Sequence, residues 1–323
     1  MASVDRNSPQ RRRASESRYS LMEFMRECPD DAACLDILWR ERFSGDGHHA
    51  RCPKCKRTRK FHRIKARPAY SCDTCGHALY PLAGTIFHKS STSLHLWFYA
   101  IYIMASTRCG VSAKQLEREL GVTYKTAWRM FNLIRNKLMA DNDVPLRGDV
   151  EVDETSVDGK PRKPQGKHAY LGDPAANRRS QAAKLRERSR ATVFAAVERG
   201  GRVKATVLPS RRGPRLKQQV IEWVQPDSIV ITDEWGAYNG LEQHFISHSR
   251  INHSAGIYVE GDTHTNTIEG FFGNLKTGIR GNYKKVSHKW LQGYLNEYTW
   301  RYNHRHDEEP MFHLLISRAA QGL

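Results

Sequence analysis

The sequence has no long hydrophobic run and no apolar core near its first residue. Within its 323 residues, no stretch reaches the roughly 18 consecutive apolar residues that a membrane-spanning helix needs. The first residues also lack the hydrophobic centre of a signal peptide. These absences exclude a membrane protein and predict a cytoplasmic one, and the chain is long enough for two or three domains.

Acidic residues are scarce relative to basic ones. The chain has 34 Asp and Glu residues against 52 Lys and Arg residues, which gives a formal net charge of +18 at pH 7. A field of that sign attracts polyanions, and a phosphate backbone is the commonest polyanion in a cell. The composition therefore predicts a nucleic-acid partner and association with the nucleoid. A basic protein without a nucleic-acid role is the simpler alternative.

Cysteine is too sparse for a disulfide scaffold. Four of the seven cysteines form two C-x-x-C units, which in a reducing compartment are typical of metal binding. Their spacing is that of a zinc ribbon, in which two tight turns close a tetrahedral thiolate site around a structural Zn²⁺. The expected zinc ligands are Cys52, Cys55, Cys72 and Cys75. The other cysteines lie among apolar residues and are expected to be buried: Cys28, Cys34 and Cys109.

The predicted zinc ribbon is strongly basic. Between Arg51 and Arg67 the sequence has nine Lys or Arg residues and no acid. A basic module of this kind is expected to contact the phosphates of DNA. The residues expected to make these contacts are Lys54, Lys56, Arg57, Arg59 and Lys60.

Breaks in the hydrophobic pattern divide the chain into segments. A basic tail at 1–17 is expected to be disordered, and a helical prelude at 18–47 precedes the zinc ribbon at 48–82. A helical DNA-binding domain is predicted at 90–142, followed by a catalytic domain at 146–320. Residues 155–190 have ten Lys or Arg residues against three acids, and we expect them to form a basic loop within the catalytic domain.

The segment after residue 110 has the pattern of a helix-turn-helix. Ser112 can cap one helix, Gly121 can form the turn and Thr123 can cap the second helix. In such a motif the second helix enters a DNA groove, where it would present Tyr124, Lys125 and Arg129. An ordinary helical bundle that never meets DNA is the alternative.

From residue 149 onward, strands and helices follow the order of an RNase H-like fold. The first strand alternates at a period of two, which places Asp149, Glu151 and Asp153 on one face. A hairpin, a helix and a fully apolar strand follow, and the last strand ends at Asp233. The predicted fold class is α/β (α+β), with an RNase H-like catalytic domain behind the zinc ribbon and the helix-turn-helix. Alternation alone does not say which acid of the first strand binds metal.

The segment 264–276 carries the next candidate residues. If it is helical from about Asn266, then Asn266, Glu269, Gly273 and Lys276 lie on one face. A carboxylate suits a hard divalent cation, and an ammonium suits a phosphate near that cation. Thirty-five residues separate Asp233 from Glu269. A helix with a solvated Glu and Lys is the alternative.

Over nearly its whole length the chain resembles bacterial insertion-sequence transposases of the DDE type, in the ISXO-like group related to Merlin elements. The resemblance implies that Asp153 and Asp233 are the first two catalytic acids and that Lys276 is the basic residue that follows. Members of this group have either Asn or Glu in third place, so Asn266 and Glu269 both stay candidates. Besides the C-x-x-C units, the similar segments are Ala83–Phe87, Gly121–Trp128, Glu151–Glu154, Thr232–Trp235, Thr265–Gly270 and Arg301–Arg305.

The resemblance also implies a mechanism. Two Mg²⁺ or Mn²⁺ ions held by Asp153, Asp233 and Glu269 would activate water to free a 3′-hydroxyl, and then activate that hydroxyl to attack target DNA. The partners would be double-stranded DNA with terminal inverted repeats, target DNA and a second copy of the chain, giving a homodimer on DNA.

Two other functions remain compatible with the same residues. A DNA-binding regulator or domesticated transposase would keep the ribbon and the helix-turn-helix without strand transfer. A metal-dependent nuclease would use the same acids to cut without joining.

Overall fold

The computed structural model describes residues 19–107, 109–141, 144–158, 190–208, 213–251 and 265–322. The chain divides into two compact units, of which one comprises Met1–Leu138 with His304–Leu323 and the other comprises Met139–Asn303. None of the helices in these described ranges is long and apolar enough to cross a membrane. The tail expected to be disordered and the basic loop from residue 159 to 189 lie outside the described residues.

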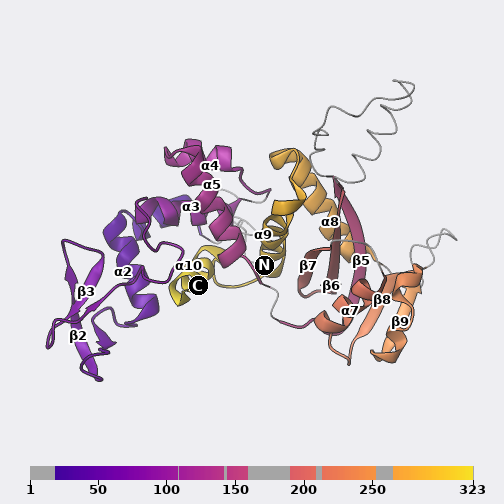
Figure 1. Ribbon diagram of the computed structural model, residues 1–323, viewed down its shortest axis with the longest axis horizontal. Helices are drawn as coiled ribbons and strands as arrows, with labels where there is room; N and C mark the ends of the chain where they lie inside the picture. Colours follow the sequence, from indigo (N-terminus) through magenta and orange to yellow (C-terminus); the bar gives the residue numbers. More distant parts are fainter. Residues whose placement is uncertain are drawn as a thin grey trace, which may run out of the picture. The chain divides into compact units, whose positions relative to one another are not determined.

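Two helices open the first unit, as the sequence predicts. Helix α1 spans Leu21–Glu27 and begins at a complete capping box, in which Ser20 and Glu23 hold each other's backbone N–H groups. Pro29 separates it from α2, which spans Asp31–Arg42 and buries Leu35, Leu38 and Trp39, among others. These helices occupy the left of Figure 1 together with the small sheet described next.

A small antiparallel sheet follows, with strands in the order β1-β2-β3-β4. The strands span His49–Arg51, Thr58–Ile64, Ala69–Cys72 and Ala78–Leu79. Its apolar side rests on α2, because the Trp39 ring stacks on Tyr70 with the ring centroids 4.1 Å apart. This stacking gives the small sheet a hydrophobic support that so few strands cannot build alone.

The rest of the first unit is helical. Helices α3, α4 and α5 span Leu94–Ser106, Ala113–Leu120 and Tyr124–Leu133, and a π-helical turn η1 follows at Ile134–Leu138. The predicted caps are confirmed, since Ser112 accepts the Gln115 N–H and Thr123 accepts the Thr126 N–H. Gly121 ends α4 in the left-handed conformation, with φ at 63°.

Helix α10, Met311–Gln321, packs against α2 and α3. This helix lies in the first unit, whereas the sequence analysis extended the catalytic domain to residue 320. Such a return of the chain depends on contacts between distant segments, which a local pattern does not report.

The second unit is built on a five-stranded sheet in the order β7-β6-β5-β8-β9. Strands β5, Asp149–Asp158, and β6, Arg190–Glu198, are antiparallel to each other, as are β6 and β7, Val203–Leu208. Strand β8, Ile229–Asp233, runs parallel to β5, and β9, Ser247–Ile251, runs parallel to β8. This order and these directions are those of the RNase H-like fold, so the prediction for the catalytic domain is confirmed.

Helices cover both faces of this sheet. One face packs on α7, Gly213–Trp223, in an apolar core that includes Val150, Val152 and Phe194. Residues at alternate positions point the other way. That second face meets α8, Asn266–Gly278, and α9, Leu291–Asn303 (Figure 1). Short helical turns link these elements: η2 at Gly236–Tyr238, η3 at Leu241–Gln243, η5 at Ile279–Tyr283 and η6 at His288–Trp290.

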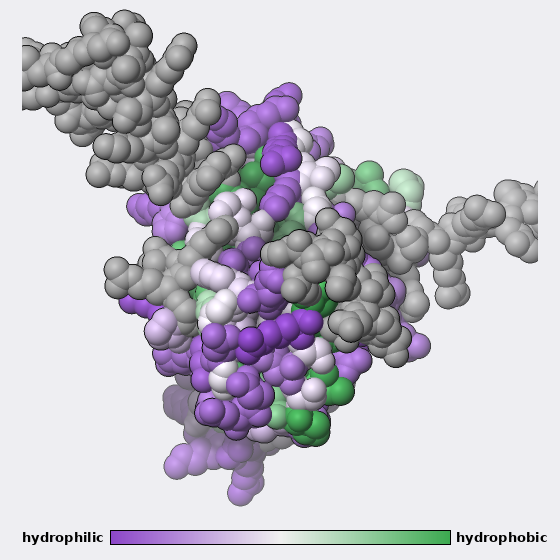
Figure 2. Space-filling model, turned by 90° about the vertical axis from the view of Figure 1, so that its right-hand side faces the viewer, coloured by the Kyte–Doolittle hydropathy of each residue, from purple (hydrophilic) through white to green (hydrophobic). Residues whose placement is uncertain are grey.

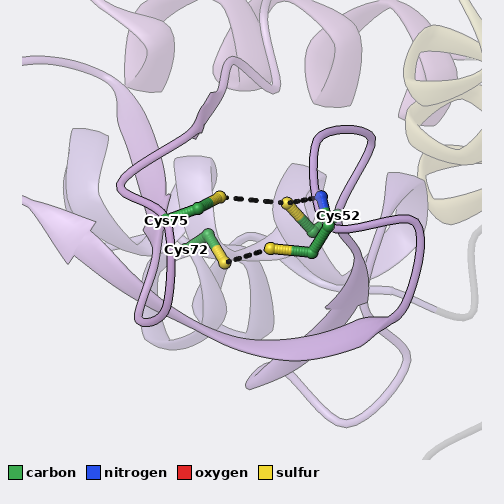
Figure 3. A group of neighbouring side chains, drawn as sticks. Cys52, Cys72 and Cys75 are labelled. Atoms are coloured by element: carbon green, nitrogen blue, oxygen red, sulfur yellow. Dashed lines mark hydrogen bonds between the residues drawn. The ribbon is translucent and has the colours of Figure 1, made fainter.

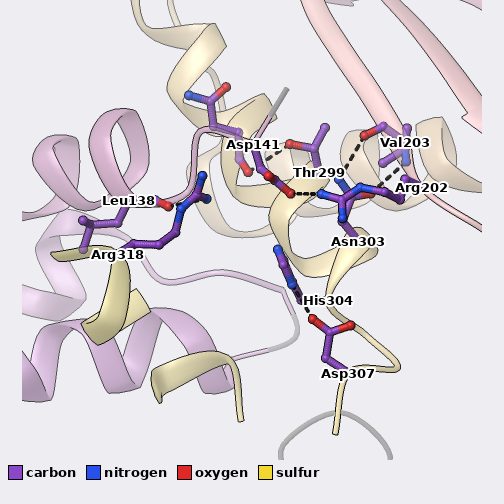
Figure 4. A network of polar contacts seen from close by, with 10 residues as sticks. Leu138, Asp141, Arg202, Val203, Thr299, Asn303, His304, Asp307 and Arg318 are labelled. Carbon is purple, nitrogen blue, oxygen red and sulfur yellow. Dashed lines mark hydrogen bonds and ion pairs between the residues drawn. The ribbon is translucent and has the colours of Figure 1, made fainter. Parts of the chain in front are cut away.

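Helix α9 covers the edge strand β7 by hydrogen bonds from two amide side chains. Gln292 accepts the Val207 N–H at 3.0 Å and donates to the Ala205 carbonyl at 3.3 Å. Asn303 accepts the Val203 N–H at 2.7 Å and donates to its carbonyl at 3.1 Å (Figure 4). These bonds satisfy backbone groups that an open edge would leave for another chain.

Two other expectations need correction. Cys109 is exposed rather than buried, because it lies in the turn between α3 and α4. Strand β5 continues to Asp158 and pairs there with Arg190, so the basic loop expected at 155–190 begins later and ends earlier. The residues after Asp153 are mostly polar, so the sequence does not predict that the strand continues.

Candidate active site and zinc centre

The four cysteines of the C-x-x-C units meet between two turns of the small sheet. Their sulfur atoms all lie within 4.8 Å of one another, with Cys52 and Cys75 separated by 3.6 Å and Cys55 and Cys72 by 4.0 Å (Figure 3). A tetrahedral zinc with Zn–S bonds of about 2.3 Å has sulfur atoms about 3.8 Å apart. The thiols are not joined in disulfides, so the geometry fits the predicted zinc site.

The backbone explains why two C-x-x-C units make this site. After each unit a left-handed residue turns the chain: Lys56 with φ at 56° and Gly76 with φ at 68°. Their N–H groups bond back to the Cys52 and Cys72 carbonyls at 2.8 and 3.0 Å. The two turns are therefore equivalent, and each aims its pair of sulfur atoms at the same point.

The sheet of the second unit brings the two predicted aspartates together. Glu151 of β5 pairs with Ile231 of the parallel strand β8. The recorded pairing ends there, but both strands continue in the same direction to Asp153 and Asp233, and Asp233 is near enough to contribute to the raised pKa of Asp153. Both aspartates thus lie at the same end of the sheet and on the face that α8 covers.

Helix α8 presents the remaining candidates as the sequence predicts. It begins at Asn266 and buries Ile268, Phe271, Phe272 and Leu275, among others. On the other side Asn266 and Glu269 are exposed and Lys276 is half-buried. The Thr265 hydroxyl donates to the Glu269 carboxylate at 3.2 Å, which steadies that side chain at the start of the helix.

The ionisation of Asp153 reflects the gathering of acids around it. Burial and the adjacent Glu154 carboxylate are the main reasons that the pKa of Asp153 rises to about 7. The carboxylates of Asp233 and Glu269 raise it further. Asp153 of β5 is therefore close enough to Asp233 of β8 and Glu269 of α8 for their charges to disfavour its own ionisation.

These acids are more widely spaced than the thiols. In the part of the chain that the structure describes, the four cysteines alone form a group of three or more ligands that all lie within 4.8 Å of one another. The carboxylates can still hold divalent cations, because such ions prefer oxygen ligands and two ions together span a broader site. Their arrangement thus fits the divalent metal that the resemblance in sequence implies.

A fourth acid, Glu154, faces the other side of the sheet. It accepts a hydrogen bond from the Tyr238 hydroxyl at 2.7 Å, and Tyr238 is fully buried in the core around α7. Burial and then Glu154 raise the pKa of the Tyr238 phenol above its ordinary range. Glu154 is therefore held away from the face that carries Asp153.

The sequence alone did not show whether Glu151 or another acid of its strand binds metal. Glu151 is completely buried and accepts the Arg199 Nε–H at 2.8 Å, the Thr267 hydroxyl at 2.9 Å and the Ile268 N–H at 3.0 Å. Asp149, on the same face, is half-exposed near Arg199. Alternation grouped these two acids with Asp153, but only the partners from the turn after β6 and from α8 distinguish their roles.

The predicted DNA contacts are accessible. On the small sheet Lys54, Lys56, Arg57 and Lys60 are exposed and Arg59 is half-buried. On α5 the three candidates, Tyr124, Lys125 and Arg129, are all exposed. Figure 2 shows a different face, on the side of the second unit, where hydrophilic residues also predominate. Contact with DNA stays a prediction for each of these residues.

Two family models match the chain. Residues 145–303 match the ISXO2-like transposase domain, and residues 29–78 match the transposase zinc-ribbon domain. The first match contains the five-stranded sheet with all the candidate acids, and the second contains the four cysteines. The resemblance drawn from the sequence is therefore confirmed.

Individual relatives agree with this assignment. The chain is 28% identical over 262 residues to an uncharacterized protein in transposable element ISH50 of Halobacterium salinarum, with 77% of this chain and 84% of that protein covered. It is 32% identical over 102 residues to an uncharacterized transposase-like protein of Haemophilus influenzae, with 32% of this chain and 81% of that protein covered.

Among solved structures, the pre-cleavage Mos1 transpososome is 13% identical with a TM-score of 0.26, covering 69% of this chain and 77% of that chain. The Mos1 strand transfer complex is also 13% identical, with a TM-score of 0.22, covering 64% and 76% of the two chains. The fold assignment rests on the strand order instead. With both family models matched in sequence order, the chain belongs to the ISXO2-like transposases and carries a transposase zinc-ribbon domain.

Proposed function

We propose that this transposase binds the terminal inverted repeats of an insertion sequence and catalyses metal-dependent cleavage and strand transfer with Asp153, Asp233 and Glu269. The observation that carries the proposal is the placement of these acids: Asp153 and Asp233 lie on the neighbouring strands β5 and β8, and Glu269 lies in the first turn of α8, which packs on β5. A carboxyl group with a raised pKa that lies among other acids, as Asp153 does, is typical of a catalytic site.

The three acids would hold two divalent cations, Mg²⁺ or Mn²⁺, with Asp153 in the centre. When bound, such ions lower the barrier to phosphodiester attack by activating the attacking oxygen and neutralising the charge that develops on the phosphate. Glu269 is the better third ligand because its carboxylate carries charge, whereas the Asn266 amide does not. Asn266 would support the site from the first turn of α8, and Lys276 would hold a DNA phosphate two turns further along.

DNA would be bound by two basic surfaces of the first unit. The exposed lysines and arginines of the zinc ribbon provide charge for phosphate contacts. The exposed residues of α5 supply groups that can reach base edges in a groove. Because an insertion sequence has two ends, a homodimer assembled on DNA would provide one active site for each end.

The test uses purified protein, Mg²⁺, an oligonucleotide with the element's end sequence and a target plasmid. Wild-type protein is expected to join the oligonucleotide to the plasmid. Asp233→Asn is expected to abolish joining while DNA binding persists. Asp227→Asn is the matched control, because Asp227 is exposed just before the same strand, and this variant should join normally.

Each outcome separates the competing functions. Joining by Asp233→Asn at the wild-type rate would overturn the assignment of the acids. Cleavage without joining by the wild-type protein would favour a nuclease. DNA binding without either reaction would favour a regulator.

A further inference from the structure

Glu151 is a completely buried acid two residues before Asp153. Three donors from two other elements converge on it. Arg199 and Thr267 donate to one carboxylate oxygen at 2.8 and 2.9 Å, and the Ile268 N–H donates to the other at 3.0 Å. Both oxygens are therefore used as acceptors.

Two of these donors belong to the first turn of α8. The first N–H groups of any helix lack partners within the helix. Thr265, which precedes α8, makes no side-chain cap, so the Ile268 N–H is satisfied by Glu151 instead. A carboxylate is favoured at this end because the helix dipole places partial positive charge there. Glu151 thus caps α8 from the neighbouring strand.

This cap ties together the elements that carry two of the proposed metal ligands. On β5, Glu151 is separated from Asp153 by one residue. On α8, the capped Ile268 is directly followed by Glu269. A shift of α8 along or away from the sheet would break the Glu151 hydrogen bonds and change the distance between the two ligand side chains.

We propose that Glu151 is a positioning residue, whose carboxylate fixes the start of α8 against β5 and thereby sets the separation of Asp153 and Glu269 for metal binding. This inference rests on the proposed function of those acids and deepens it. Arg199 balances the buried charge and orients the Glu151 carboxylate from the turn that follows β6.

The chemistry of the site favours positioning over simple stabilisation. A buried ion pair often contributes little to stability compared with apolar residues of the same size, although its hydrogen bonds are directional. A glutamine at this position would turn an NH₂ group toward a donor, whichever way its amide is placed. The arrangement of donors therefore requires a carboxylate, which is the group that can hold helix and strand in one register.

The first test is a Mn²⁺ titration of the full-length zinc-loaded protein, followed by electron paramagnetic resonance. Glu151→Gln is expected to weaken Mn²⁺ binding about 10- to 100-fold, as loss of an outer contact to a ligand does. Zinc content, circular dichroism and DNA binding should stay as in the wild type. Glu198→Gln is the control, since Glu198 lies on β6 away from α8 and should leave Mn²⁺ binding unchanged.

A double-mutant cycle separates positioning from a general structural role. If Glu151 acts through Glu269, then Glu151→Gln should change Mn²⁺ affinity less than about twofold when Glu269→Gln is already present. An equal loss of affinity in both backgrounds would overturn the inference. So would wild-type affinity in Glu151→Gln itself.

Thr267→Val keeps the test decisive if Glu151→Gln fails to fold. This variant removes one of the three hydrogen bonds and should weaken Mn²⁺ binding about three- to tenfold. Unchanged affinity in a folded Thr267→Val protein would contradict the proposal.

Comparing the wild type with Asp233→Asn separates failure of the proposed function from failure of the positioning role. If Asp233→Asn binds Mn²⁺ as tightly as the wild type, the proposed function of the acids fails and the inference fails with it. If Asp233→Asn loses Mn²⁺ while Glu151→Gln retains it, only the positioning role fails.

Discussion

Replacing Asp153 by Asn should stabilise the protein when divalent cations are absent from the acid site. Burial, Glu154 and the two other acids raise the pKa of the Asp153 carboxyl from 3.8 to about 7. Its Oδ1 atom accepts the Glu154 N–H at 2.7 Å, and an Asn oxygen can keep that bond. The substitution therefore removes an unfavourable charge without removing the local hydrogen bond.

The direction in which stability changes with pH follows from proton binding to Asp153. Because the folded protein holds the Asp153 proton up to about pH 7 and the unfolded chain releases it near pH 4, the folded state is favoured at low pH. The penalty for ionised Asp153 is absent below pH 4, grows between pH 4 and 7, and is constant above. A shift of about three pKa units corresponds to at most about 4 kcal/mol in the free energy of unfolding.

The assay is urea denaturation at pH 5 and pH 8 in buffer that retains zinc and contains no Mg²⁺. The advantage of Asp153→Asn over the wild type should grow by about 3 kcal/mol between these two values. Asp149→Asn is the matched control on the same strand. Since Asp149 is half-exposed beside Arg199 at 3.8 Å, its neutralisation should change stability by less than about 1 kcal/mol.

In Mg²⁺ the wild type should become more stable than Asp153→Asn, since the ion binds the wild-type acids and stabilises the fold that holds them. Two results would refute the reasoning. One is a loss of stability in Asp153→Asn at pH 8, and the other is an equal gain at both pH values.

Three further predictions concern other parts of the molecule. Gly278→Ala should destabilise the protein by about 1–3 kcal/mol in urea denaturation, because its Cβ would lie 1.5 Å from the Tyr298 hydroxyl. Gly273→Ala, in the same helix with nothing within 4 Å of its Cβ, should instead gain about 0.5–1 kcal/mol, and equal effects at both positions would contradict this packing. Elemental analysis should find zinc in the wild type and none in Cys72→Ser, and retained zinc in the variant would exclude the four-thiolate site. Lys54→Ala should reduce the salt dependence of DNA binding by about one unit of slope, and an unchanged slope would remove it from the interface.

Much of the fold follows from local signals in the sequence. The caps Ser112 and Thr123, the turn at Gly121 and the β6–β7 hairpin depend on residues within a few positions of one another. Helix α8 is likewise predicted by its apolar periodicity. The position of α10 cannot be predicted in this way. Its apolar face does not indicate that it packs against α2 and α3.

Some residues of the candidate site can likewise be predicted from local signals, whereas others depend on contacts between distant segments. Strand ends predict Asp153 and Asp233, and helical periodicity places Glu269 and Lys276 on one face. Glu151 could not be separated from its neighbours, because its burial depends on Arg199 in the turn after β6 and on the start of α8. Those partners are 48 and 117 residues away along the chain.

The most direct measurement is a crystal structure of the protein with Mn²⁺ and end DNA, in which anomalous scattering locates the metal. The account predicts Mn²⁺ within about 2.0–2.6 Å of carboxylate oxygens of Asp153, Asp233 and Glu269. Mn²⁺ bound to Asn266 with Glu269 turned away would contradict the choice of third ligand. Mn²⁺ bound elsewhere, with the three acids free of metal, would contradict the central claim.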